Sequence, residues 1–274
     1  MRLWHAFTRH WLPVYAGLFI VFLYLPVLLV PVFAFNSSAV PAFPLTGLTT
    51  KWFESLAHAS AIHSAALNSL VVALTTSVLS TLLGICAARA TTRYVFPAKS
   101  LMKGVIMAPL ILPEIIIAVS LLIMILQAGI DLSLMTITAG HVLFCLPYSI
   151  SVLTAGFEGF DRSLEEASSD LGETAFGTFR RITLPMMAPS IISSLLVSFT
   201  ISFDEFILAF FLGGTQTTLP VYMFAQLRFA AKLPTILALG TLILVISVLF
   251  LILAENYRRR AEARVNLTGG SIAV

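Results

Sequence analysis

The sequence predicts an all-α membrane protein that crosses the bilayer about six times. Of its 274 residues, 58% are hydrophobic and only 11% are charged, whereas soluble domains carry about 25% charged residues. The mean hydropathy is +0.98, and six apolar stretches reach the roughly 20 residues that a membrane span requires. Too few polar side chains remain to cover a surface that faces water on all sides.

The six predicted spans differ in their internal features. The first is too long for a cleaved signal peptide and contains Pro26 and Pro31. Pro109 and Pro113 predict a kink in the third, because proline removes a helix hydrogen bond. A loop of a few residues around Asp131 makes the third and fourth spans a tight hairpin. In chain order the spans are expected at residues 14–35, 65–90, 104–128, 134–157, 187–212 and 235–254.

Lysine and arginine predict the orientation, since they accumulate in cytoplasmic segments. With the N-terminus in the cytoplasm, all but three of the 16 Lys and Arg residues fall in cytoplasmic segments, counting Arg89 at the cytoplasmic end of the second span, and none falls in the interior of a span. The exceptions are Lys51, Arg228 and Lys232, in the outer segments 36–64 and 213–234. Both termini are therefore expected in the cytoplasm. The second outer segment is expected to hold a short helix or a re-entrant piece over 219–229.

The cytoplasmic segment between the fourth and fifth spans predicts two short helices. Ser163 and Glu166 have the spacing of a capping box, which starts a helix. Gly172 stands where a glycine would end that helix, and Phe176 and Phe179 give the second helix an apolar ridge. Such a segment can lie on the membrane surface or bind a partner protein, and the pattern alone favours neither.

This segment resembles the EAA loop of the permease subunits of ABC importers. That motif reads E-A-A, three residues, G, nine residues, I, one residue, L-P, and the chain departs from it only where Ser168 replaces the second alanine. The resemblance implies a MetI-like permease that forms one transmembrane domain over residues 1–274, with the coupling loop at 158–186. The residues that it assigns to coupling with the ATPase are Glu166, Ala167, Gly172, Phe176, Phe179, Leu184 and Pro185.

The same resemblance implies the partners and the location of the chain. They are ATP-binding-cassette ATPase subunits inside, a solute-binding protein outside and a second permease subunit, with a heterodimer of permeases preferred. The chain lacks a G-x-x-x-x-G-K-[ST] phosphate loop. ATP and magnesium are therefore expected on the partner, with no cofactor, metal or catalytic residue on this chain. The expected location is the bacterial inner membrane.

Three acidic residues inside the predicted spans, Glu114, Asp204 and Glu205, point to a cationic solute. Ionisable groups within a membrane are costly and therefore suggest function. Adjacent positions on a continuous helix lie roughly 100° apart, so Asp204 and Glu205 are expected to face different ways. Ser202 and Phe203 are added to the predicted pathway, since hydroxyl groups and aromatic faces suit an ammonium group. A structural, hydrogen-bonded role for each acid is the alternative.

The stretch Ser202–Phe206, with the following Leu-Gly-Gly turn and Thr218-Leu219-Pro220, resembles the spermidine/putrescine (PotC-like) branch of these permeases. This resemblance implies transport of a polyamine. Importers of opines or other amine-containing solutes are alternatives. An ion-coupled secondary transporter with the three acids as a proton relay is a further alternative, although the chain shows no internal repeat.

Overall fold

The computed structural model describes residues 2–159, 161–249 and 252. These residues form helices and loops, with one isolated antiparallel bridge between Asn36 and Leu48. They fall into two compact units, one made of Ser60–Phe224 and the other of the segments before and after it. Each unit is described by itself. The predicted cytoplasmic arginines after residue 257 lie outside the described residues.

The terminal unit contains two helices that are long and apolar enough to cross a membrane. Helix α1 (Arg2–Ala34) supplies the stretch Trp11–Ala34, and the second stretch is Ala230–Leu249. Between them in sequence, the short helix α2 (Lys51–Ala57) is tied to the preceding loop, because Trp52 Nε1 donates a 2.8 Å hydrogen bond to the Asn36 carbonyl. The predicted sixth span, 235–254, continues past Leu249 into positions that are mostly outside the described residues.

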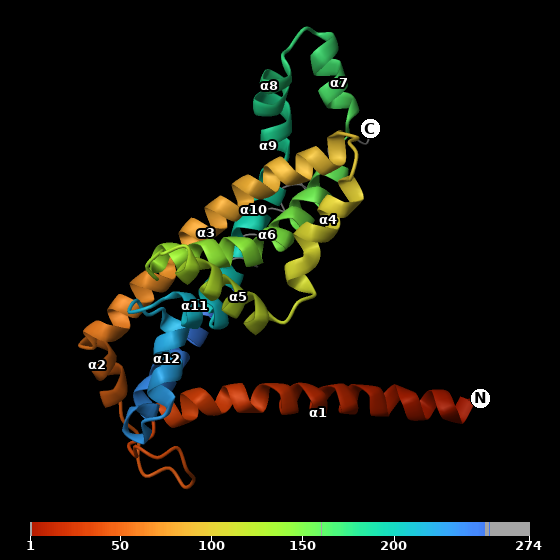
Figure 1. Ribbon diagram of the computed structural model, residues 1–274. Coiled ribbons are helices and arrows are strands. Elements are labelled where there is room, and N and C mark those ends of the chain that lie inside the picture. The colour runs from red at the N-terminus through yellow and green to blue at the C-terminus, as the bar shows by residue number, and fades with distance from the viewer. Residues whose placement is uncertain (1, 160, 250–251, 253–274) are drawn as a thin grey trace. The chain divides into compact units, whose positions relative to one another are not determined.

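The central unit is built on three helices that pack along one another: α3 (Ser60–Arg93), α6 (Leu134–Glu158) and α10 (Ala188–Asp204) (Figure 1). Small residues allow this close approach, as is usual between membrane helices. A Cβ atom added at Gly84 of α3 would collide with Ser149 and Leu153 of α6.

Hydroxyl groups join the same three helices inside the central unit. Ser149 Oγ donates to the Ser80 carbonyl at 2.9 Å and lies 2.8 Å from Ser194 Oγ, which lies 3.0 Å from Thr81 Oγ1. All four residues are buried. These four residues therefore form hydrogen bonds between the helices instead of facing lipid.

The third predicted span is sharply bent. Helix α4 (Lys99–Met107) and a 3₁₀ turn (Ala108–Leu110) are followed by α5 (Glu114–Gln127), and the two parts meet at 102°. Pro109 lies in the turn and Pro113 has an extended backbone immediately before α5. The kink predicted from these prolines is present, and it is large enough to make two helices of one expected span.

The fifth predicted span is not continuous, contrary to expectation. Helix α10 ends at Asp204, Glu205 has extended backbone angles (φ −68°, ψ 121°), and a new helix α11 (Ile207–Leu212) follows. Helix α12 (Leu219–Leu227) comes next, in the segment where a short helix was expected. By length and composition, the described residues contain four spans, or six if two bent helix pairs, Lys99–Leu110 with Glu114–Gln127 and Ala175–Met186 with Ala188–Asp204, each count as one, in agreement with the predicted number.

Candidate functional site

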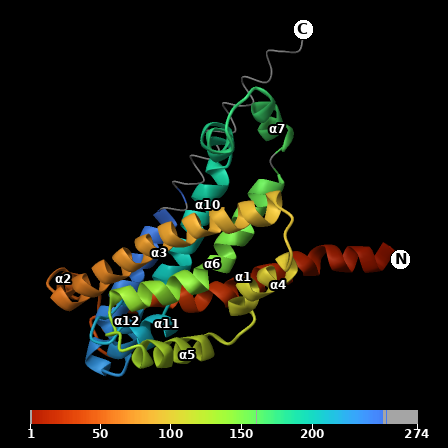
Figure 2. The same ribbon diagram turned by 45° about the horizontal axis from the view of Figure 1, so that its top comes forward.

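The predicted cytoplasmic loop is a helical hairpin that extends past one end of α3, α6 and α10 (Figures 1 and 2). Its first arm is α7 (Ser163–Asp170). Its second arm contains α8 (Ala175–Thr178), a π-helical turn (Phe179–Thr183) and α9 (Leu184–Met186).

Helix α7 starts without the predicted capping box. The side chain of its N-cap residue, Arg162, makes no capping hydrogen bond to the helix backbone; instead, Asp161 Oδ1 accepts a 2.9 Å hydrogen bond from the Ser163 N–H. This bond, with a second from the Ser163 hydroxyl, holds the pKa of the exposed Asp161 carboxyl below its usual value. Glu166 pairs with Arg162 at 3.0 Å rather than reaching back to the helix start. Asp161, two residues before Ser163, therefore caps the start of α7, the role that the prediction had assigned to Ser163.

The turn between the two arms depends on Gly172. Its φ of +86° lies in the left-handed region that glycine adopts without steric cost, so the prediction that Gly172 ends the first helix is confirmed. Ser168 faces inward and its Oγ lies 2.9 Å from Thr178 Oγ1 on the second arm. The serine that departs from the E-A-A motif thus forms a buried hydrogen bond between the arms.

The residues predicted to contact an ATPase divide into outward and inward groups. Glu166, Ala167 and Phe176 are exposed, and the Phe176 side chain is 72% exposed. Leu184 and Pro185 are exposed at the base of the second arm. Phe179 is half-buried, and the Arg89 guanidinium of α3 lies 4.3 Å from its ring centroid.

The acids at the break in the fifth predicted span lie in unlike surroundings. Asp204 is exposed, whereas Glu205 is 8% exposed and accepts a 2.7 Å hydrogen bond from the Leu208 N–H of α11. The Glu205 carboxyl also lies near the Glu114 carboxyl at the start of α5. The acids do face different ways, but the reason is the end of α10 between them and not the 100° step of a continuous helix.

Ser202 and Phe203 do not join Asp204 on its exposed face. Ser202 is 3% exposed, and its Oγ lies 2.8 Å from Nδ1 of the buried His141 on α6. The structure therefore places Ser202 in the helix interface, which is a correction to its predicted position on a solute pathway. Phe203 is half-buried, with its ring stacked 5.7 Å from that of Phe199.

Residues 80–263 match the model of the family described as "Binding-protein-dependent transport system inner membrane component". The chain belongs to this family. It is thus a permease of a binding-protein-dependent ABC importer, a multi-pass protein of the inner membrane, and a transport component rather than an enzyme.

Curated relatives support the same assignment over nearly the whole permease. The spermidine/putrescine transport system permease protein PotC of Shigella flexneri is 32% identical over 252 residues, which cover 92% of this chain and 94% of the relative. The putrescine transport system permease protein PotI of Escherichia coli (strain K12) is 37% identical over 231 residues, which cover 81% and 82%.

Solved structures share the fold of the permease. A chain of a bacterial alginate ABC transporter, crystallised with a periplasmic protein that holds an alginate pentasaccharide, superposes with a TM-score of 0.69 at 19% identity, covering 95% of this chain and 98% of the other. A chain of an amino acid ABC transporter matches with a TM-score of 0.58 at 16% identity, covering 78% and 100%.

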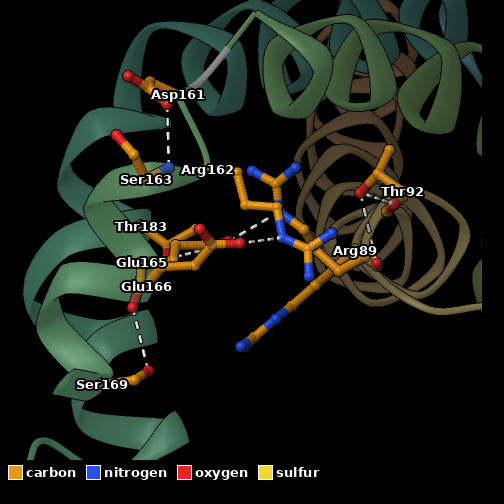
Figure 3. A network of polar contacts seen from close by, with 11 residues as sticks. Arg89, Thr92, Asp161, Arg162, Ser163, Glu165, Glu166, Ser169 and Thr183 are labelled. Atoms are coloured by element: carbon orange, nitrogen blue, oxygen red, sulfur yellow. Dashed lines mark hydrogen bonds and ion pairs between the residues drawn. The ribbon is translucent and has the colours of Figure 1, made fainter.

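Sequence reasoning missed one residue of the permease loop that has several partners, Glu165. Its Oε2 lies 2.8 Å from Nε of Arg93, at the end of α3, and its Oε1 accepts a 2.7 Å hydrogen bond from the Thr183 hydroxyl (Figure 3). The motif draws attention to the neighbouring Glu166. Nothing in the sequence pairs Glu165 with an arginine from another helix, although two adjacent glutamates on a short helix necessarily face different sides.

Proposed function

We propose that this permease moves a cationic polyamine across the inner membrane, driven by an ATPase that docks on the loop of residues 158–186. ATP and magnesium bind to that partner and not to this chain. A second permease subunit completes the pathway, in a heterodimer by preference, and a solute-binding protein delivers the polyamine from outside. The names of the PotC and PotI relatives support the substrate class.

The observation that carries the proposal is the exposed carboxylate of Asp204. It ends α10 on a face where Leu196 and Thr200 are also exposed. A carboxylate directed at lipid is strongly unfavourable. This face therefore lines a polar space between permease subunits, where an ammonium group would be held by Asp204 as a charge-assisted hydrogen-bond partner.

The docking assignment is supported by the exposed side of the loop. The exposed Glu166, Ala167 and Phe176 give a partner protein one acidic group and one large aromatic group on the two arms. Aromatic side chains are enriched at the centres of protein interfaces. The ion pair between Glu166 and Arg162 is exposed and weak enough to be exchanged for a pair with the partner.

The test is uptake of radiolabelled putrescine by cells that produce the intact importer with Asp204→Asn. Removing a charged hydrogen-bond partner weakens binding by about 1.5–3 kcal/mol, so we expect the KM to rise at least about tenfold. Asp204→Glu, which keeps the charge, should retain most of the uptake. Asp131→Asn, which neutralises an exposed acid outside the spans, is the matched control.

Three results would contradict the proposal. An unchanged KM in Asp204→Asn would remove this carboxylate from the pathway. The second test purifies the tagged chain in mild detergent and identifies its companions by mass spectrometry. Recovery without an ATPase, or equal ATPase recovery with Glu166→Lys and the unmodified chain, would remove the docking surface.

A further inference from the structure

The end of α3 touches both arms of the coupling loop through two arginines. Arg93 forms a 2.8 Å ion pair with Glu165 on the first arm, and the Arg89 guanidinium lies over the ring of Phe179 on the second arm. Arg89 and Arg93 lie four residues apart on α3, so both project from the same side of that helix. The loop is therefore attached to α3, a membrane-spanning helix that lies much earlier in the sequence.

The ion pair is shielded from water. The side chains of Arg93 and Glu165 are 13% and 15% exposed, and the second oxygen of Glu165 is occupied by the hydroxyl of the fully buried Thr183. Arg93 also lies 5.7 Å from the Phe157 ring centroid, near the end of α6. Glu165 thus links α3, the first arm and the second arm in one network (Figure 3).

A second ion pair of the loop has the same length but a different environment. Arg181 Nη1 lies 2.8 Å from Glu173 Oε2, with 75% and 30% of the two side chains exposed. Both of these residues belong to the loop, so their pair connects the loop only to itself. Exposed pairs contribute little to stability, whereas loss of one partner from a shielded pair leaves the other charge uncompensated.

We infer that Glu165 and Arg93 are positioning residues that transmit movement of the docked loop to α3. The inference rests on the proposed docking of an ATPase to the outward face of the loop. When the loop is displaced, the shielded pair and Thr183 keep both arms fixed to the end of α3, so the helix follows the loop. Without the pair, the loop can move while α3 remains in place.

The experiment uses the complete importer in proteoliposomes, with putrescine as the transported probe. Uptake and ATP hydrolysis are measured together for the unmodified chain, Glu165→Gln, Arg93→Gln and the double variant. We expect each single variant to transport roughly five- to tenfold less putrescine per ATP hydrolysed, a typical size for coupling between sites. The double variant should transport as much putrescine per ATP as a single variant, because the effects of removing two residues that act as a pair do not add.

Controls separate transmission from folding and from docking. Arg181→Gln removes the exposed pair of equal length and should leave the ratio of transport to hydrolysis unchanged. Thr183→Val keeps the shape of Thr183 but removes its bond to Glu165, and should lower the ratio less than Glu165→Gln does. Each variant should copurify with as much ATPase as the unmodified chain, since Glu165 and Arg93 lie on the inward side.

The outcomes distinguish this inference from the proposed function. If the unmodified chain shows no ATP-dependent putrescine uptake, the proposed function fails. If the unmodified chain is coupled and both single variants keep its ratio of transport to hydrolysis, the transmission role is wrong. Losses that multiply in the double variant would also overturn it, because Glu165 and Arg93 would then act independently.

Discussion

At the level of single residues, Asp204 and Glu205 are neighbours in the sequence but lie in different environments, which suit different roles. Asp204 is the last residue of α10 and is exposed, whereas Glu205 is buried beside Glu114 and bonds to α11. A carboxylate with a fixed backbone partner is poorly placed to bind and release a solute. The structural alternative for an intramembrane acid therefore fits Glu205, and the solute-binding alternative fits Asp204.

Replacing Glu205 by alanine should lower the stability of the permease. The change removes the acceptor of the Leu208 N–H, and loss of a helix-capping side chain costs about 1 kcal/mol. Thermal unfolding of the purified permease in detergent measures this loss. Glu205→Gln retains an oxygen acceptor and should unfold closer to the unmodified chain. Equal unfolding of Glu205→Ala and the unmodified chain would show that the cap contributes nothing.

At the level of secondary-structure elements, the contact of α3 with α6 depends on the absence of a side chain at Gly84. A Cβ atom there would meet Ser149 and Leu153. Ser149 is already bonded to α3 and to α10. An added methyl group therefore has to separate the helices or displace that hydroxyl.

Gly84→Ala should accordingly lower the midpoint of thermal unfolding, because overpacking typically costs about 1–3 kcal/mol. Gly104→Ala is the matched control: Gly104 also lies within a helix, and a Cβ atom there meets nothing within 4 Å. Alanine favours a helix over glycine by about 1 kcal/mol, so the control should be unchanged or slightly more stable. A gain in stability at Gly84 as well would argue against the close contact.

For the whole molecule, the distribution of Lys and Arg makes a prediction that labelling can test. Ala42 is in the expected outer segment, Asp170 is in the coupling loop, and both are exposed. In a Cys86→Ser background, a membrane-impermeant maleimide should label Ala42→Cys in intact cells. Asp170→Cys should react only in inverted vesicles. Cys145 is buried and should remain unlabelled. Labelling of Asp170→Cys from outside would reverse the predicted topology.

Much of the fold follows from features that lie close together in the sequence. Apolar runs predict the spans, Pro109 and Pro113 predict the bend before α5, and Gly172 predicts the turn of the loop. The break after Asp204 has no such signal, because Glu205 and Phe206 are neither proline nor glycine. It is stabilised by the bond from Glu205 to Leu208 and by packing of α11 against α5, and both depend on the folded chain.

The functional residues were predicted less completely for the same reason. The motif selects Glu166, but the side that each residue of the loop presents depends on its contact with α3. Ser202 was assigned to a pathway from its spacing along one helix. Its partner, His141, belongs to another helix, and a pattern within one segment cannot show which side of a helix meets its neighbour.

The two adjacent glutamates of α7 have a consequence for chimaeras in which the coupling loop of one permease is replaced by that of another. On the proposed docking, Glu166 would face the ATPase and could exchange its exposed pair with Arg162, whereas Glu165 is held by a shielded pair with Arg93 of α3. Substitutions at position 166 should therefore covary with a partner gene, and those at position 165 with position 93. A chimaera that receives only the loop of another permease would carry the recognition surface without its attachment, so the end of α3 has to be transplanted with it.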